Sequence, residues 1–552
     1  MANQNHARRL LQCLTVATRP LRVEELAEIL ALDFGAEGTT PKLNEDWRWE
    51  DQQRSVLSTC SSLVSLVDNG GPRVIQFSHF SVKEYLTSDR LSTSTDLLHF
   101  HITPEPAHTT LARACLGVLL QLDGGSNNSR VGGSSPLARY ASRYWVEHAQ
   151  FGAVSSRIED GMRRLFDSTK PHFTAWLRLH DIDEHWVQFT DYKIARHGSP
   201  LYYASLCGFH DLAAHIIAEH PEQVHARGGY NHSPLVAALY KGHFDIAELL
   251  HRHGADVEVT GHENRTPLQA ASVDGLIDVV QWLLDHGADA NSQEDDHRTP
   301  VYSATSNGHL EVVRTLLGHG VRINAANNAG HTPLHRAANY GYVEIARLLL
   351  EHGADIDVQN KHYSTPLHLA SSNGRLEAVR LLLDHVADVE AENTDGRTPL
   401  HLASSSGGAE TVRLLLDRGA NANAENKEGW TPLHLASSEG HTESVRLLLD
   451  RGTNADAKSK DGWAALHLAS KAEIVHLLLD RGANADTQDR GGWSPLHEAS
   501  SEGRTEIVRL LLDRGASANA KDEAGRIPAQ VASGKGKNEI IQMLACCSMV
   551  RE

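Results

Sequence analysis

The sequence is poor in aromatic residues and in cysteine. Aromatic side chains make up 6% of the 552 residues, and there are six cysteines, none of them in a Cys-x-x-Cys pair. This excludes a disulfide-stapled scaffold and thiolate zinc sites, and it favours a reducing compartment. The chain also lacks any run of 18 apolar residues, so we expect no membrane span and a cytoplasmic protein, with the nucleus as the alternative.

Positive charge is also scarce. The chain has 52 Lys and Arg against 70 Asp and Glu, which gives a net charge of −18. A general nucleic-acid coat needs a basic face and is disfavoured. The motifs Gly-x-x-x-x-Gly-Lys-Ser/Thr, His-Glu-x-x-His and Gly-x-Ser-x-Gly are all missing. We therefore expect a protein that is not an enzyme and that uses no cofactor, metal or small-molecule substrate.

An internal repeat dominates the last two thirds of the chain. A Thr/Ser-Pro-Leu pattern recurs about every 33 residues, and internal periods of this length indicate a solenoid. The register positions are Pro200, Pro234, Pro267, Pro300, Pro333, Pro366, Pro399, Pro432, Ala465, Pro495 and Pro528. Six units continue with a histidine in the same place: His335, His368, His401, His434, His467 and His497.

Each part of the repeat has a physical reason. Thr or Ser before Pro suits a helix N-cap, and Pro suits the first helical position because its missing N–H is not needed there. A Leu-rich second helix follows and is ended by a glycine such as Gly353 or Gly419, which adopts the left-handed conformation freely. The pattern predicts about eleven units of helix, turn, helix and hairpin, and single units must stack to bury their apolar faces.

The motifs Thr-Pro-Leu-His-x-Ala and Leu-Leu-x-x-Gly-Ala-x-x-Asn closely resemble the ankyrin repeat over residues 198–545. The resemblance implies a mainly α solenoid that binds protein partners on a concave surface of hairpins and inner helices.

The repeat pattern fails at two places. Ala464-Ala465 replaces Thr-Pro, and the same unit lacks three residues after Ser470. Val386 stands where other units have Gly, and a β-branched residue is strained in the left-handed region. We expect lower local stability at both places.

The first 100 residues predict a winged-helix order. The expected helices are 5–18, 23–32, 55–63 and 80–88, with a hairpin from 63–68 to 73–78 around the Asn69-Gly70-Gly71-Pro72 turn. The segments 11–30 and 77–86 resemble the winged helix that follows the NACHT ATPase in fungal NACHT–ankyrin, NLR-like signal-transduction proteins. The family's ATPase domain would precede residue 1 and is absent from this sequence, so ATP hydrolysis is not carried over.

The remaining residues complete the predicted organisation. We expect a winged-helix-like domain at 1–100, a helical linker and N-terminal cap at 101–197, the ankyrin array at 198–545 and a C-terminal tail at 546–552. The linker helices are expected at 107–122, 136–151, 155–167 and 172–179, separated by a Gly/Ser/Asn-rich segment at 124–135.

Aromatic residues in the array are the candidate partner-binding sites. Trp430, Trp463 and Trp493 follow the hairpin Gly in three consecutive units, and an aromatic row is typical of binding anchors. Packing of each ring on its neighbour's hairpin is the alternative reading. Tyr340, His331 and Tyr363 occupy related positions and are weaker candidates.

Three functions follow in order of preference. The resemblance implies the sensing and regulatory half of an NLR-like signalling protein. A generic intracellular ankyrin scaffold or adaptor is the alternative. DNA binding by the winged helix is disfavoured, because residues 1–100 carry 10 basic against 13 acidic side chains.

Overall fold

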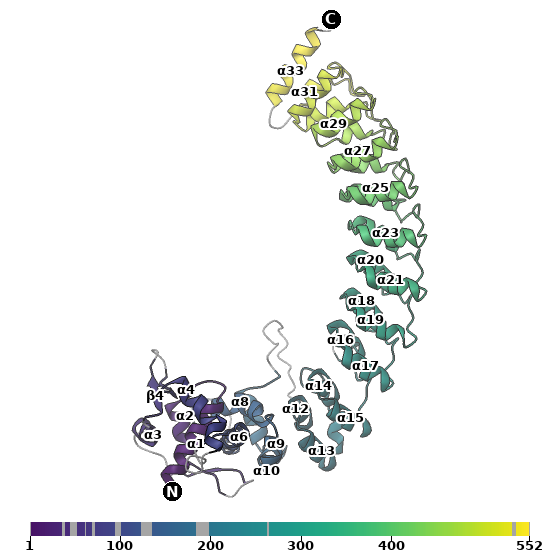
Figure 1. Ribbon diagram of the computed structural model, residues 1–552. Helices are drawn as coiled ribbons and strands as arrows, with labels where there is room; N and C mark the ends of the chain where they lie inside the picture. The colour runs from purple at the N-terminus through teal and green to yellow at the C-terminus, as the bar shows by residue number, and fades with distance from the viewer. Residues whose placement is uncertain are drawn as a thin grey trace. The chain divides into compact units, whose positions relative to one another are not determined.

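The computed structural model describes residues 2–35, 39–44, 52–60, 62–68, 72–93, 101–122, 135–183, 198–261, 264–532 and 537–550. These residues form two compact units, Met1–Gly261 and His262–Glu552 (Figure 1).

The first unit begins with a winged-helix arrangement of three helices and a small sheet, as predicted from the sequence. The elements are α1 (Ala2–Val16), β1 (Leu21–Arg22), α2 (Val23–Leu30), β2 (Leu32–Asp33), β3 (Lys42–Leu43), α3 (Gln52–Cys60), β4 (Val64–Val67), β5 (Val74–Phe77), α4 (Phe80–Leu86) and α5 (Asp89–Ser92). Strands β1, β5 and β4 form an antiparallel sheet in that order. Ile75 in the central strand β5 pairs with Leu21 of β1 on one side and with Leu66 of β4 on the other.

Helix α2 illustrates why this part folds. Leu26, Ile29 and Leu30 recur at helical spacing and are all buried. Glu25 is buried too, and its carboxylate accepts hydrogen bonds from the Arg19 guanidinium at 2.6 and 2.9 Å and from the Arg22 N–H at 2.7 Å. The buried charge is therefore fully paired, as a buried charge must be.

A bundle of helices follows and encloses an aromatic cluster. Trp145 and Trp176 are fully buried with ring centroids 5.4 Å apart, and the Trp176 indole N–H donates to the Ser142 carbonyl at 3.0 Å. The helices are α6 (Pro104–Leu119), α8 (Ala138–Ala149), α9 (Val154–Arg157), α10 (Glu159–Leu165) and α11 (His172–Leu179). Most of the Gly/Ser/Asn-rich segment predicted at 124–135 lies outside the described residues.

Tyr203 joins this bundle to the first repeat. Its ring lies 6.0 Å from Trp176, and its hydroxyl donates to the Asp181 carboxylate at 2.7 Å. Tyr202 in the same helix donates to Asp183 at 2.7 Å. The bundle thus covers the first face of the stack with both apolar and polar contacts.

The described residues contain eleven helix pairs, which confirms the predicted solenoid. Two pairs lie in the first unit: α12 (Pro200–Cys207) with α13 (His210–Glu219), followed by η4 (Pro221–His225), and α14 (Pro234–Tyr240) with α15 (Phe244–Arg252). The second unit holds α16 (Pro267–Asp274), α17 (Ile277–Asp285), α18 (Pro300–Ser306), α19 (Leu310–Leu317), α20 (Pro333–Tyr340), α21 (Val343–Glu351), α22 (Pro366–Ser372), α23 (Leu376–Asp384), α24 (Pro399–Ser406), α25 (Ala409–Asp417), α26 (Pro432–Ser438), α27 (Thr442–Asp450), α28 (Ala465–Leu468), α29 (Ala472–Asp480), α30 (Pro495–Ser501), α31 (Thr505–Asp513), α32 (Pro528–Val531) and α33 (Lys537–Val550).

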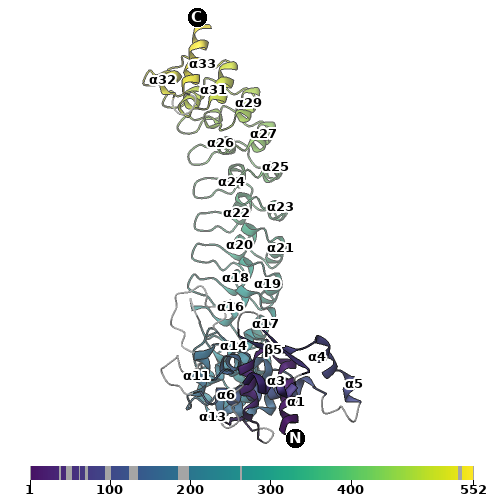
Figure 2. The ribbon, with the colours of Figure 1, turned by 90° about the vertical axis from the view of Figure 1, so that its left-hand side faces the viewer.

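Local sequence signals set the ends of these helices. The Thr266 and Thr299 hydroxyls accept from backbone N–H groups in the first turn, and a proline follows each of them. Gly353 and Gly419 end the second helices with φ of 88° and 90°, as expected for left-handed C-caps. In Figure 2 the loops of the second unit project to one side, the first helices run down the middle, and the second helices form the other side.

The two irregular units have the geometry that their sequences suggest. Val386 adopts φ 66° at the end of α23 and is 84% exposed. In the shortened unit the first helix α28 spans only Ala465–Leu468, and the turn is rebuilt by Ser470, whose N–H donates to the Ser437 carbonyl of the preceding unit at 3.3 Å.

We predict that Val386→Gly stabilises the protein by about 1–2 kcal/mol, because glycine removes the left-handed strain and the exposed isopropyl group loses little burial. Urea unfolding followed by circular dichroism measures the change. The reciprocal variant Gly419→Val, at a site where an added Cβ meets no atom within 4 Å, should destabilise by a similar amount. An unchanged midpoint in both variants would contradict the role of strain.

Candidate partner-binding surface

Six buried histidines each tie their own repeat to the following one. In His401 the Nδ1 atom accepts from the Thr398 N–H at 3.1 Å, while Nε2 lies 3.0 Å from the Trp430 carbonyl of the following unit. Because Nδ1 accepts an N–H, the ring proton sits on Nε2 and is donated to that carbonyl. The same two contacts recur at His335, His368, His434, His467 and His497.

Burial disfavours the charged form of five of these rings. Desolvation lowers the pKa of His335 and of His401 to about 4, and it lowers the pKa of His368, His434 and His467 as well. With both ring nitrogens engaged in hydrogen bonds, all six histidines have a structural role.

Gln269 makes the same two contacts in another unit with an uncharged side chain. Its Oε1 accepts from the Thr266 N–H at 2.9 Å, and its Nε2 donates to the Arg298 carbonyl of the next unit at 3.2 Å. The amide reproduces both contacts of the imidazole with a group that does not titrate.

The loops between units form a second ladder. The Lys427 N–H donates to the Asp395 carbonyl of the preceding loop at 2.9 Å, and the Lys460 N–H donates to the Glu428 carbonyl at 3.0 Å. Within a loop, the Asn426 side chain accepts from the Glu428 and Trp430 N–H groups at 3.0 and 2.8 Å. These turns fix the position of the residue that precedes each N-cap.

The three predicted tryptophans occupy this position before the N-cap. The carbonyls of Trp430, Trp463 and Trp493 accept the bonds from His401, His434 and His467. All three side chains are half-buried, with ring centroids 5.7–6.1 Å from the histidine of their own unit. The backbone of each tryptophan is thus part of the stack, and part of each ring stays open to solvent.

The other predicted site residues lie in different settings. His331 holds the position of the tryptophans three units before Trp430. It is half-buried, and burial lowers its pKa. Tyr340 ends α20, is 38% exposed and packs on the Arg336 guanidinium, whose carbon lies 4.6 Å from the ring centre. Tyr363 lies in a loop with φ 56° and is 58% exposed.

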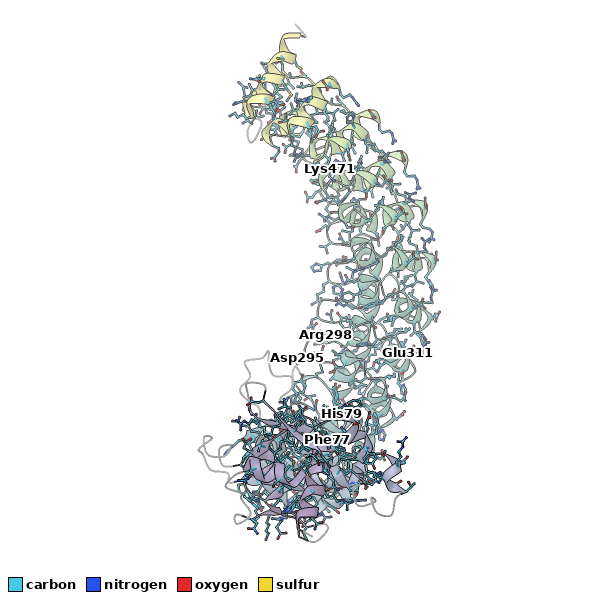
Figure 3. All side chains as sticks on the ribbon, turned by 60° about the vertical axis from the view of Figure 1, so that its left-hand side comes forward. Phe77, His79, Asp295, Arg298, Glu311 and Lys471 are labelled. Carbon is cyan, nitrogen blue, oxygen red and sulfur yellow. The ribbon has the colours of Figure 1, made fainter. Side chains whose placement is uncertain are left out.

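The second helices carry a charge ladder that the sequence reading missed. Arg418 pairs with Asp384 of the preceding unit at 2.8 Å, and Arg514 pairs with Asp480 at 2.7 Å. Arg451 pairs with Asp417, and Arg481 with Asp450, in the same way. The recurring Asp-Arg dipeptide at the end of the second helix was the available signal. In Figure 3 Glu311, which belongs to the second helix α19, lies on the opposite side of the array from Asp295 and Arg298, which belong to the loop before α18.

Glu–Arg pairs three residues apart are also present on the second helices. Arg380 lies 3.4 Å from Glu377, and Arg446 lies 3.2 Å from Glu443, with all four side chains well exposed. Exposed pairs at this spacing contribute only a few tenths of a kcal/mol.

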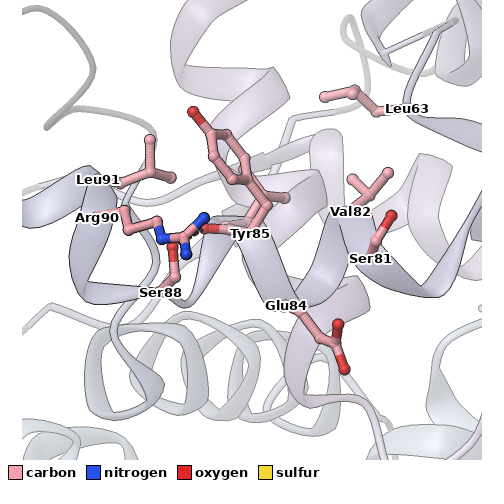
Figure 4. Close-up of a pocket in the computed structure, with 9 residues that line it drawn as sticks. Leu63, Ser81, Val82, Glu84, Tyr85, Ser88, Arg90 and Leu91 are labelled. Carbon is pink, nitrogen blue, oxygen red and sulfur yellow. Dashed lines mark hydrogen bonds between the residues drawn. The ribbon is translucent and has the colours of Figure 1, made fainter.

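The winged helix carries an open apolar pocket of about 700 Å³ (Figure 4). Its lining includes Leu63, Val82, Tyr85 and Leu91. The nearby Phe80 ring is 70% exposed. In the wing, Arg73 lies 3.6 Å from Asp68, so its charge is partly offset, which does not favour a phosphate-binding face.

Other classes of site find no support in the described part of the chain. It holds no group of three or more His, Cys, Asp or Glu side chains that could bind a metal ion. None of its helices combines the length and the apolarity that crossing a membrane requires.

Comparisons with known proteins agree with this architecture. The family model for ankyrin repeats matches five overlapping segments: 201–294, 269–360, 355–426, 410–489 and 471–550. Residues 1–97 match the winged helix domain of GPI inositol-deacylase.

Two known proteins show the extent of the similarity. The azaphilone pigments biosynthesis cluster protein L of Monascus ruber is 32% identical over 261 residues, which are 44% of this chain. The chain covers 53% of that relative's length. The solved human ASB11 ankyrin repeat domain is 28% identical, with a TM-score of 0.37 over 40% of this chain and 99% of that domain.

The protein is therefore a helical repeat solenoid preceded by a winged helix domain. Since the repeat matches reach from residue 201 to residue 550, more than half of the chain, it belongs to the ankyrin-repeat family.

We predict that acid weakens the array through its neutral histidines. The pKa of His401 in the folded protein lies below the ordinary value of 6.5. Its contribution to the free energy of unfolding is therefore complete above pH 6.5 and is lost as the pH falls toward 4. This linkage lowers the free energy of unfolding by about 2 kcal/mol at pH 5. His401→Gln, which copies Gln269, should reduce the loss of stability between pH 7 and pH 5 by that amount, as measured by urea unfolding.

The exposed His362, changed to Gln, is the matched control and should leave the pH dependence unaltered. Equal pH dependence of His401→Gln and the unmodified protein would contradict the assignment.

Proposed function

We propose that the protein is an interaction module that binds a protein partner through the first-helix and loop side of its ankyrin array. The row of Trp430, Trp463 and Trp493 carries this proposal. The stack holds their backbones through the histidine bonds, so the rings are positioned before a partner arrives. Pre-positioned tryptophans lose little conformational entropy on binding and are frequent anchors of protein interfaces.

The alternative role for the rings is to stiffen the stack. Their half-burial is consistent with both roles, since an anchor also needs a fixed ring. The same position is held by Ser364 and Arg397 in earlier units, whose carbonyls accept the equivalent histidine bonds at 2.9 Å. The stack therefore needs the backbone of this position and accepts side chains other than tryptophan.

The finer proposal concerns the pathway. We infer that the chain is the sensing and regulatory half of an NLR-like signalling protein, with the domain boundaries 1–100, 101–197, 198–545 and 546–552. Two observations support it: a winged helix match precedes the ankyrin matches in the order of fungal NACHT–ankyrin proteins, and a relative comes from a fungus. An NLR-like role would place the protein in the cytoplasm.

We predict that changing Trp430, Trp463 and Trp493 together to Ser, the residue native at 364, abolishes partner capture and leaves the secondary structure and cooperative melting intact. Affinity capture from a fungal extract with the full chain, followed by mass spectrometry, identifies the partner. Circular dichroism melting monitors the fold.

The matched control changes Arg380, Arg413 and Arg446 to Ser, one per unit on the second helices. It should retain every partner. Capture that survives the tryptophan changes, or melting that loses its cooperative transition, would overturn the anchor role.

A further inference from the structure

Two neighbouring units of the array have loops and first helices without acidic residues. Residues 324–343 and 358–376 contain no Asp or Glu, but they contain Arg336, Lys361 and Arg375. The corresponding stretches of the unit before them and of every unit after them carry acids. A chain with a net charge of −18 therefore has a positively charged region on the first-helix and loop side of these two units.

Arg336 in the first helix α20 is half-buried and held in place. Its Nε donates to the Ser306 hydroxyl of the preceding unit at 3.2 Å. Its guanidinium carbon lies 4.6 Å from the ring centre of Tyr340, one turn later in α20, and 5.9 Å from that of Tyr302 in α18. Another of its N–H groups donates to the Tyr340 hydroxyl. A guanidinium that packs on aromatic rings in this way keeps further N–H donors for a carboxylate.

A second arginine contacts the last turn of the same helix. Arg375 precedes α23 in the next unit, and its Nε donates to the Asn339 carbonyl at 3.2 Å. Asn339 directly precedes Tyr340, which is 38% exposed. Two guanidinium groups from neighbouring units thus lie at the end of α20 that carries an open aromatic ring. Among the described residues neither Arg336 nor Arg375 has a carboxylate within ion-pair distance.

The arginines of the preceding loops are different in this respect. Arg265 and Arg298 are also half-buried, but both pair with the buried Glu294 carboxylate, at 2.9 and 2.5 Å. Asp296 in the same loop pairs with Arg298 at 3.5 Å and accepts from the Asn327 amide at 3.2 Å. The array thus neutralises half-buried arginines with its own acids in those loops, and it leaves the two arginines at the end of α20 without such acids.

We infer that this surface binds an acidic segment of the protein partner, with Asp or Glu carboxylates on Arg336 and Arg375 and the segment packed over Tyr340. The inference rests on the proposed function and names the chemistry of the partner at one part of the first-helix and loop side. Charge complementarity selects this occupant, since both guanidinium groups can donate charge-assisted hydrogen bonds to carboxylates. Arg and Tyr are also enriched among the residues that dominate binding at protein interfaces.

The chain itself supplies substitutions that the fold accepts at both positions. Leucine is native at the position of Arg336 in the unit of Leu369, and at the position of Arg375 in the unit of Leu276. The double variant Arg336→Leu with Arg375→Leu therefore removes both charges with a precedent in the same array for each. Arg336→Glu reverses one charge and has a precedent in Glu498.

The test uses the full chain and a random-peptide phage library as the probe. Selection on the unmodified protein should enrich peptides that carry Asp or Glu. A synthetic peptide from that set should bind the double leucine variant about tenfold more weakly, because its charge-assisted hydrogen bonds are lost. Selection on Arg336→Glu should no longer enrich acidic peptides.

The matched control removes two charges from the second helices of the same two units. Arg347→Leu with Arg380→Leu changes the net charge equally, at arginines that pair with glutamates of their own helices at 3.8 and 3.4 Å. This control should bind the acidic peptide normally. Circular dichroism melting of each variant checks that the fold is kept.

The outcomes separate this inference from the proposed function. Enrichment of peptides without acidic residues, or acidic peptides that bind the double leucine variant and the control equally well, would show that the inference is wrong. The tryptophans lie in other units, so their changes to Ser test the anchor role independently. Peptides that lose binding with the tryptophan changes but not with the arginine changes would leave the proposed function in place and overturn the acidic preference.

Discussion

The structure depends on a hydrogen bond that no repeat can make alone. In six consecutive units an imidazole N–H donates to the carbonyl at the start of the next unit, while the other ring nitrogen accepts from the N-cap N–H of its own first helix. One side chain therefore completes a helix and joins two units. A buried donor without its acceptor costs about 1–3 kcal/mol, so each of these six units is stabilised by the unit that follows it. The loop ladder and the Asp–Arg pairs on the second helices add to this coupling along the array.

This coupling also organises the candidate binding surface. The carbonyl that accepts the histidine bond belongs to the residue before the N-cap, the position of Trp430, Trp463 and Trp493. The stack needs only the backbone of that residue, so its side chain is free to vary, from Ser364 and Arg397 to the three tryptophans. The separation of backbone and side-chain roles at one position lets a rigid array carry a variable recognition surface.

Much of the fold could be predicted from the sequence because its signals are local and repeated. Thr-Pro starts a helix, Gly ends one, and Leu at helical spacing faces the core, so the eleven helix pairs and the order of the winged helix agreed with expectation. The strain at Val386 followed from one residue that departs from the glycine found at this position in eight other units. The bonds between units were harder to predict, because the partner of His401 is a carbonyl 29 residues away and the ring tautomer is set by the fold.

Only part of the candidate site could be predicted from the sequence in this way. The tryptophan row is visible as a column in the repeat, but its half-burial depends on packing against His434, His467 and His497. The most direct test of the account is NMR titration of the imidazoles in the histidine-labelled full chain. We predict that His335 and His401 have pKa values of about 4, and that above this pH they stay neutral with the proton on Nε2. Titration of these rings near pH 6.5, or protons on Nδ1, would contradict the claim that they hold the units together.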